Sequence, residues 1–176
     1  YNRKGRVIGM KIIDGGVTAA KGFQAACCEA NIKYKNRTDM AMVYSKQPCE
    51  CAGTFTTNVV KAAPVKWEYK VVNESEYAQA IVVNSGVANA CTGEEGYGYC
   101  KDMAKAVADT FSLKEDSVLV ASTGVIGKQL PMDIITAGIK AFAGKPENTR
   151  EAARLAAEAE AKRIAEEEAR LAAEAE

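Results

Sequence analysis

The sequence predicts an α/β or α+β fold followed by one long C-terminal helix. Short apolar runs typical of strands alternate with segments whose apolar residues recur at helical spacing, as far as residue 143. From residue 144 the composition changes abruptly to strong helix formers. We therefore expect a folded domain over residues 10–143 and a helical segment over residues 144–176.

Three short apolar runs are the expected strands of the domain. Each is rich in Val, Ile, Leu or Met and ends at polar or turn residues, a pattern typical of buried strands. They are Met40–Tyr44, Ala80–Val83 and Ser117–Val120.

Two helices are expected between and after these strands. The first begins at Thr92, which with Glu95 forms a capping-box pattern. The second begins after Pro131, a residue favoured at helix starts. The apolar face of the first helix consists of Met103, Ala104, Val107, Ala108 and Phe111, and that of the second consists of Ile135, Ile139 and Phe142.

The C-terminal segment is predicted to be a single helix. Residues 150–176 contain no Gly or Pro, and residues 151–160 are nearly repeated as residues 167–176. Such uniform helix propensity favours an engineered origin, with a natural charged helix or a coiled-coil arm as the alternative. We expect the only large apolar residues of this helix to pack against the domain: Leu155, Ile164 and Leu171. Residues 1–9 are interpreted as an added segment on weaker grounds, because Met10 makes a natural start.

Composition argues against two classes of partner. Lys plus Arg and Asp plus Glu balance at 23 each, whereas a nucleic-acid-binding domain carries a clustered basic face. No apolar run reaches the roughly 18 residues that a membrane-spanning helix requires. The basic first residues are not followed by the apolar stretch of a signal peptide. The sequence thus predicts a cytoplasmic protein that binds neither nucleic acid nor membrane.

Histidine and cysteine usage restricts the chemistry. The chain contains no histidine, which removes Ser-His-Asp and Cys-His arrangements together with histidine acid–base catalysis. An N-terminal threonine whose own α-amine takes its proton is one alternative. The six cysteines lack the spacing of zinc ribbons and follow no export signal, so we expect free, mostly buried thiols and no metal site.

Three segments have the small and polar residues of loops at strand ends, where α/β proteins build their sites. They are residues 55–65 (FTTNVVKAAPV), 83–90 (VNSGVANA) and 121–127 (ASTGVIG). Outward backbone N–H groups in the third could hold a developing negative charge, although a turn required only for packing explains the pattern equally well. For the other two segments a packing role is favoured. Glycines at 93–98 and 124–128 match neither a dinucleotide fingerprint nor a P-loop, so no nucleotide cofactor is expected.

In order and spacing, these segments resemble the ornithine acetyltransferases of arginine biosynthesis. The resemblance extends from about Met10 to Phe142 and includes two further segments near the start, GFQA at 22–25 and RTDMA at 37–41. Its longest motifs are VVNSGVANACTGEEG at 82–96 and VLVASTGVIGKQLPMD at 118–133.

The resemblance implies a fold and an activity. Members of that family are made as a precursor that cleaves itself before a threonine, and this threonine becomes the N-terminal nucleophile of the β chain. The enzyme transfers acetyl from N-acetylornithine to glutamate through an acetyl-enzyme, and some members also accept acetyl-coenzyme A. The implied fold is a sandwich of sheets and helices similar to that of N-terminal-nucleophile hydrolases, without a cofactor. The Thr-Gly pair that supplies the family's oxyanion hole corresponds to Thr123 and Gly124.

The resemblance also implies what this sequence lacks. The family's α chain continues into an IMTTDT-like strand and then the cleavage site, and neither follows residue 143 here. The chain is thus interpreted as the oxyanion-hole half of an acyltransferase, inactive without the β chain of the same precursor. The alternative is an engineered scaffold domain without catalysis, in which the helix of residues 144–176 covers apolar surface that β normally buries.

Overall fold

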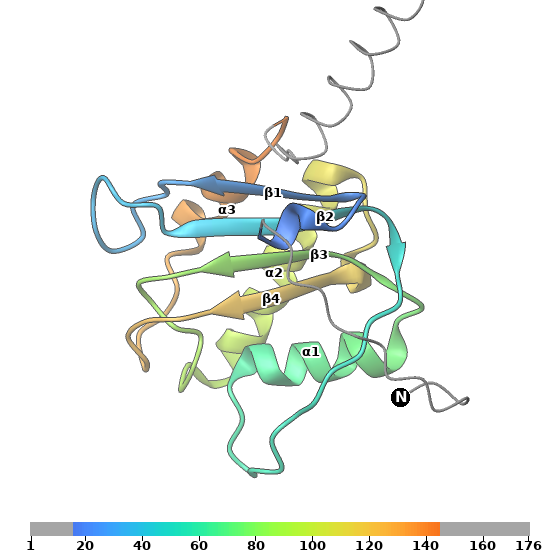
Figure 1. The fold of residues 1–176 in the computed structure, drawn as a ribbon. Helices are drawn as coiled ribbons and strands as arrows, with labels where there is room; N and C mark the ends of the chain where they lie inside the picture. Colours follow the sequence, from blue (N-terminus) through green and yellow to red (C-terminus); the bar gives the residue numbers. More distant parts are fainter. Residues whose placement is uncertain (1–15, 145–176) are drawn as a thin grey trace, which may run out of the picture.

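Four strands form one sheet in the order β1-β2-β3-β4 (Figure 1). The structure is a computed structural model that describes residues 16–144. In chain order its elements are η1 (Val17–Ala19), β1 (Phe23–Cys28), β2 (Met40–Cys49), α1 (Ala63–Glu74), β3 (Ala78–Asn84), α2 (Gly93–Phe111), η2 (Glu115–Ser117), β4 (Val118–Ser122) and α3 (Met132–Lys140).

Strand direction brings three connections to one end of the sheet. Strands β1 and β2 are antiparallel, as are β2 and β3, whereas β3 and β4 are parallel. Strands β1, β3 and β4 therefore all finish at the same end of the sheet, on the left in Figure 1. The loops that follow these three strands lie together there, which is the arrangement that builds sites in α/β proteins.

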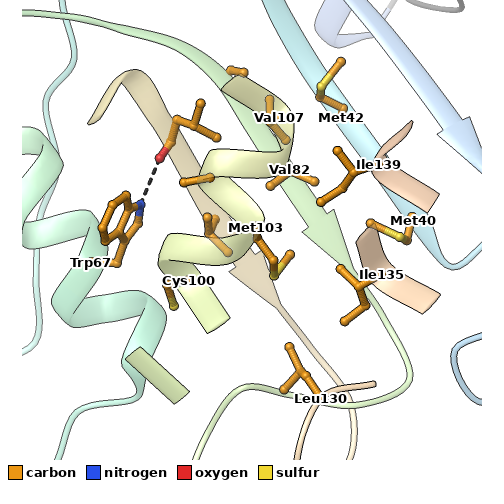
Figure 2. Packing of buried hydrophobic residues seen from close by; sticks show 14 of the residues in the cluster. Met40, Met42, Trp67, Val82, Cys100, Met103, Val107, Leu130, Ile135 and Ile139 are labelled. Carbon is orange, nitrogen blue, oxygen red and sulfur yellow. Dashed lines mark hydrogen bonds between the residues drawn. The ribbon is translucent and has the colours of Figure 1, made fainter. Parts of the chain in front are cut away.

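Helices α2 and α3 lie behind the sheet in Figure 1 and cover one of its faces. Alternate residues of the strands point into this layer and meet apolar side chains of the two helices (Figure 2). Burying each large apolar side chain stabilises the fold by about 1.5–3 kcal/mol. The fully buried side chains of this core include Met40, Met42, Val82, Met103, Ile135 and Ile139.

Helix α1 runs along the outer edge of β4 (Figure 1). The indole N–H of Trp67 donates to the carbonyl of Val118 at 2.9 Å, drawn as the dashed line in Figure 2. The Glu68 carboxylate accepts from the backbone N–H of Val120 at 2.6 Å. Two consecutive helix residues thus satisfy an acceptor and a donor of an edge strand, a position that otherwise invites pairing with another chain.

The opposite face of the sheet is apolar and is not covered by α2 or α3. The strand pairing places alternate residues from three neighbouring strands side by side on this face. They are Ala41, Val43, Ile81, Val83, Leu119 and Ala121. The side chain of Ile81 is 40% exposed, which is unusual for a large aliphatic residue at the centre of a sheet. We call this surface the open face.

The structure confirms the α/β class, the three expected strands and the two expected helices. Strand β2 is longer than expected and runs on to Cys49. Helix α3 ends at Lys140, so Phe142 lies in the following turn, although it is fully buried as expected for a core residue. Neither β1 nor α1 was among the elements expected from the sequence.

Two sequence-based expectations are wrong. Thr92 does precede α2, but its side chain makes no capping hydrogen bond, and its hydroxyl donates to Asn89 Oδ1 at 2.7 Å. The cysteines are all free, but they are not mostly buried. Only Cys100 is buried, whereas Cys27 and Cys91 are exposed and the other three are half-buried.

Some expectations fall outside the described residues. These are the addition over residues 1–9 and nearly all of the helix over residues 144–176, including the packing of Leu155, Ile164 and Leu171. Within residues 16–144, no helix is both long enough and apolar enough to cross a membrane.

Candidate functional site

Two of the glycine-containing motifs meet at the end of β3 and β4. The backbone N–H of Thr123 donates to the carbonyl of Asn84 at 3.0 Å, and that of Val125 donates to Gly86 at 3.2 Å. The backbone N–H of Ala88 returns a bond to Val125 at 2.9 Å. The parallel pairing of the strands therefore continues into their loops, which fixes the two motifs against each other.

A buried polar pair holds the same junction. Asn84 is fully buried, and its Nδ2 donates to the carbonyl of Val87 at 2.9 Å. Its Oδ1 accepts from the hydroxyl of Ser122 at 2.5 Å. A buried amide left without partners is costly, so these bonds explain why polar residues end both strands.

Gly124 allows the two loops to touch. Its φ is +132°, in a region that side chains disfavour. A Cβ at this position would lie 2.5 Å from the carbonyl oxygen of Gly86 and 2.7 Å from the backbone nitrogen of Val87. Only glycine fits here.

The loop presents two hydrogen-bond donors to solvent. Thr123 and Gly124 are both exposed, and within residues 16–144 no acceptor bonds the Thr123 hydroxyl or the Gly124 N–H. The N–H of Thr123 donates to Asn84, whereas the N–H of Gly124 has no acceptor among residues 16–144. The hydroxyl is therefore the donor that Thr123 can offer. One hydroxyl and one adjacent N–H form the kind of donor pair that stabilises an oxyanion.

A pocket of about 350 Å³ opens at these donors. Its walls come from the loop after β4, the loop after β3 and the connection between β1 and β2. The lining residues are Lys33, Tyr34, Arg37, Asp39, Ser85, Gly86, Thr123, Gly124 and Val125. Lys33 and Tyr34 were not expected as site residues, because they lie in a segment without a recognisable motif.

The third motif borders a neighbouring pocket of about 540 Å³. Thr54, Phe55 and Thr56 line it on one side, and Ser122 lines it where β4 ends. Glu68 also lines it, and burial raises the pKa of this carboxyl to about 7 although the hydrogen bond from Val120 acts in the opposite direction. The segment around Phe55 therefore does not join the Thr123 pocket, but it flanks the same strand end.

Comparison with known proteins decides the family. A model of the ArgJ family matches residues 24–173. The chain belongs to the ArgJ family. The arginine biosynthesis bifunctional protein ArgJ 1 of Clostridium acetobutylicum is 49% identical over 133 residues, which cover 75% of this chain and 32% of that protein. The ArgJ protein of Gloeobacter violaceus is 47% identical over 130 residues, with 74% and 32% covered.

Solved structures agree with the ArgJ assignment. The crystal structure of ornithine acetyltransferase with ornithine from Mycobacterium tuberculosis is 41% identical with a TM-score of 0.72, over 76% of this chain and 72% of that chain. The ArgJ structure from Bacillus halodurans is 43% identical with a TM-score of 0.70, over 76% of this chain and 69% of that chain. This ArgJ chain spans about a third of the length of the curated relatives, since it covers 32% of each.

Proposed function

We propose that this chain is the α part of an acetyltransferase that moves acetyl from N-acetylornithine to glutamate, with Thr123 and Gly124 as its oxyanion hole. The observation that carries the proposal is the pair of open donors, the Thr123 hydroxyl and the Gly124 N–H, at the mouth of the pocket. Membership of the ArgJ family supports the reaction, because the relatives carry the name of arginine biosynthesis proteins.

The proposed chemistry has two half-reactions. The N-terminal threonine of the β chain attacks the acetyl carbonyl of N-acetylornithine, and its own amine takes the hydroxyl proton. Thr123 and Gly124 hold the negative charge that develops on the carbonyl oxygen. When the tetrahedral intermediate collapses, the C–N bond breaks and the proton passes to the leaving amine of ornithine. The amine of glutamate then attacks the acetyl-threonine ester through the same oxyanion contacts, which frees the threonine hydroxyl and forms N-acetylglutamate.

The open face supports a β-chain partner. Its four cross-strand pairs are all aliphatic, and exposed aliphatic surface of this kind marks a contact with another protein segment. Strand β4, which borders this face, ends at Ser122, and Thr123 is the next residue. A β chain packed on the open face would therefore lie next to the oxyanion donors.

The relative lengths of the matched proteins support the same partner. The chain covers 32% of the curated ArgJ proteins but 72% and 69% of the two crystallised chains. The crystallised polypeptides are thus much shorter than the full-length proteins. A precursor divided into two chains accounts for this difference.

Trapping of the acetyl-enzyme tests the proposal. The enzyme assembled with its β chain is incubated with N-acetylornithine without glutamate, and each chain is analysed by mass spectrometry. We expect one acetyl group on the N-terminal threonine of β, none on this chain, and loss of the label when glutamate is added. The purified 176-residue chain alone should transfer no acetyl. Acetyl transfer by the chain alone would refute the assignment of the nucleophile to the β chain.

A further inference from the structure

The connection between β1 and β2 brings two cations to the pocket that holds Thr123 and Gly124. Lys33 and Arg37 both line this pocket, and both are exposed. Within residues 16–144 the ion pairs join other lysines to carboxylates, so no described Asp or Glu neutralises either cation. Their charge is available to a ligand.

The connection is fixed by Asp39. This carboxylate is only 7% exposed and accepts from the backbone N–H of Ala30 at 2.7 Å and of Ile32 at 2.6 Å. The carbonyl of Asp39 accepts from the N–H of Ser85 at 2.8 Å, which ties the connection to the loop after β3. Because both carboxylate oxygens serve backbone groups, Asp39 orders the connection without pairing to Lys33.

The two cations converge on one aromatic ring. Lys33 Nζ lies 4.9 Å and Arg37 Cζ lies 5.8 Å from the centroid of Tyr34. A hydrogen bond to Lys33, together with the positive charges of Lys33 and Arg37, lowers the pKa of the Tyr34 phenol. The same charges that favour a phenolate favour any other anion at this wall of the pocket.

We propose that Arg37 and Lys33 form a subsite for the carboxylate of an N-acyl amino acid whose acyl oxygen is held by Thr123 and Gly124. A guanidinium offers two parallel N–H groups that match the two oxygens of a carboxylate, and the lysine adds a point charge. The pocket, at about 350 Å³, falls within the roughly 300–1,000 Å³ typical of small-molecule sites. An N-acyl amino acid carries both an acyl carbonyl and a carboxylate, so one molecule can engage both walls. The inference rests on the proposed function for the reaction, but its binding contact can be measured separately.

Binding is tested with the 176-residue chain and two probes, N-acetyl-L-ornithine and its α-carboxamide, in titrations followed by NMR. We expect the carboxylate probe to bind about 10- to 100-fold more tightly than the amide, because a hydrogen bond to a charged group is lost in the amide. Arg37→Gln should abolish this preference, and Arg37→Lys should restore part of it. Lys33→Gln should weaken the preference. Equal affinity for the two probes would overturn the subsite.

Lys114→Gln is the matched control. Lys114 Nζ also lies beside an aromatic ring, 5.0 Å from the centroid of Tyr77, but it does not line the pocket. Its substitution should leave the preference for the carboxylate probe unchanged. An equal loss with Lys114→Gln and Lys33→Gln would mean that overall charge, rather than the subsite, selects the anion, and would overturn the proposal.

Kinetics of the assembled enzyme separates this proposal from the proposed function. Arg37→Gln should raise KM for N-acetylornithine by about 10- to 100-fold while kcat changes little, and KM for the carboxamide should stay unchanged. A fall in kcat with normal KM would contradict a binding role. An inactive wild-type enzyme whose chain still prefers the carboxylate probe would overturn the proposed function and support the subsite.

Discussion

At the scale of single residues, the site depends on a glycine without a side chain and on a buried amide with hydrogen bonds at both its nitrogen and its oxygen. Gly124 has no side chain, so its loop can approach the backbone of Gly86. Asn84 uses both ends of its amide, on Val87 and on Ser122. These contacts place the Thr123 hydroxyl at the pocket, and no described acceptor bonds it. Such pre-organised donors are what oxyanion stabilisation requires.

Glu68 is expected to make stability depend on pH. Burial raises the pKa of its carboxyl to about 7, above the ordinary value of 4.5 that applies to the unfolded chain. The folded state therefore binds this proton more tightly, and the stability it contributes is present below about pH 4.5 and is lost as pH rises through about 7. Glu68→Gln should remove this contribution, so urea unfolding should show the variant gaining stability relative to wild type between about pH 5 and about pH 8.

Glu74→Gln provides the control on the same helix, because Glu74 is exposed at the end of α1. This substitution should not alter the pH dependence. A stability difference between Glu68→Gln and wild type that is constant across that pH range would contradict the assignment.

Residue roles were only partly predictable from the sequence. Thr123 and Gly124 could be proposed as site residues because they lie in a long motif that resembles a known family. The hydrogen bond from Thr92 to Asn89 could not be predicted, because only the local fold brings the Asn89 amide beside the Thr92 hydroxyl. Lys33 lies in a segment without a motif, and Arg37 lies in a recognised segment but was not assigned to the site, because the pocket is assembled from three segments that are distant in sequence.

At the scale of elements, the start of α2 is shaped around one glycine. A Cβ at Gly96 would lie 2.7 Å from Asn89 Oδ1 and closer still to the Thr92 hydroxyl, whereas a Cβ at Gly98 would meet nothing within 4 Å. Both glycines lie in the first half of the same helix.

These two glycines give a matched pair of substitutions. Gly96→Ala should destabilise the fold by about 1–3 kcal/mol, because the added methyl overpacks a buried hydrogen-bonded pair. Gly98→Ala should instead stabilise it by about 1 kcal/mol through helix propensity alone. Urea unfolding of the two variants measures both changes. Equal shifts in the same direction would show that Gly96 is not held by the Asn89–Thr92 pair.

The elements that the sequence predicts are those with strong apolar patterns. Strands β3 and β4 are runs of mainly aliphatic residues, and α2 has an apolar stripe over several turns. Strand β1 was missed because it consists mainly of small residues and cysteines at the edge of the sheet. Helix α1 was missed because its buried face is only Ala63, Trp67 and Val71 among polar neighbours.

At the scale of the whole molecule, the proposed function and the architecture both indicate a partner on the open face of the sheet. The sheet has helices α2 and α3 on one face and aliphatic residues on the other. Thr123 and Gly124, the proposed oxyanion donors, directly follow β4, the strand that borders this open face. We propose that activity belongs to the enzyme assembled with a β chain, in which this chain supplies the oxyanion hole and the cationic wall of the pocket.

The most direct measurement is the turnover of Thr123 variants in the enzyme assembled with its β chain. Thr123→Ala removes the hydroxyl and should lower kcat by about 10²–10³ with a smaller change in KM, because this donor acts on the charge that develops in the transition state. Thr123→Ser keeps the hydroxyl and should retain most of the rate. Near-normal turnover by Thr123→Ala, or an equal loss in both variants, would contradict the assignment of Thr123 to the oxyanion hole.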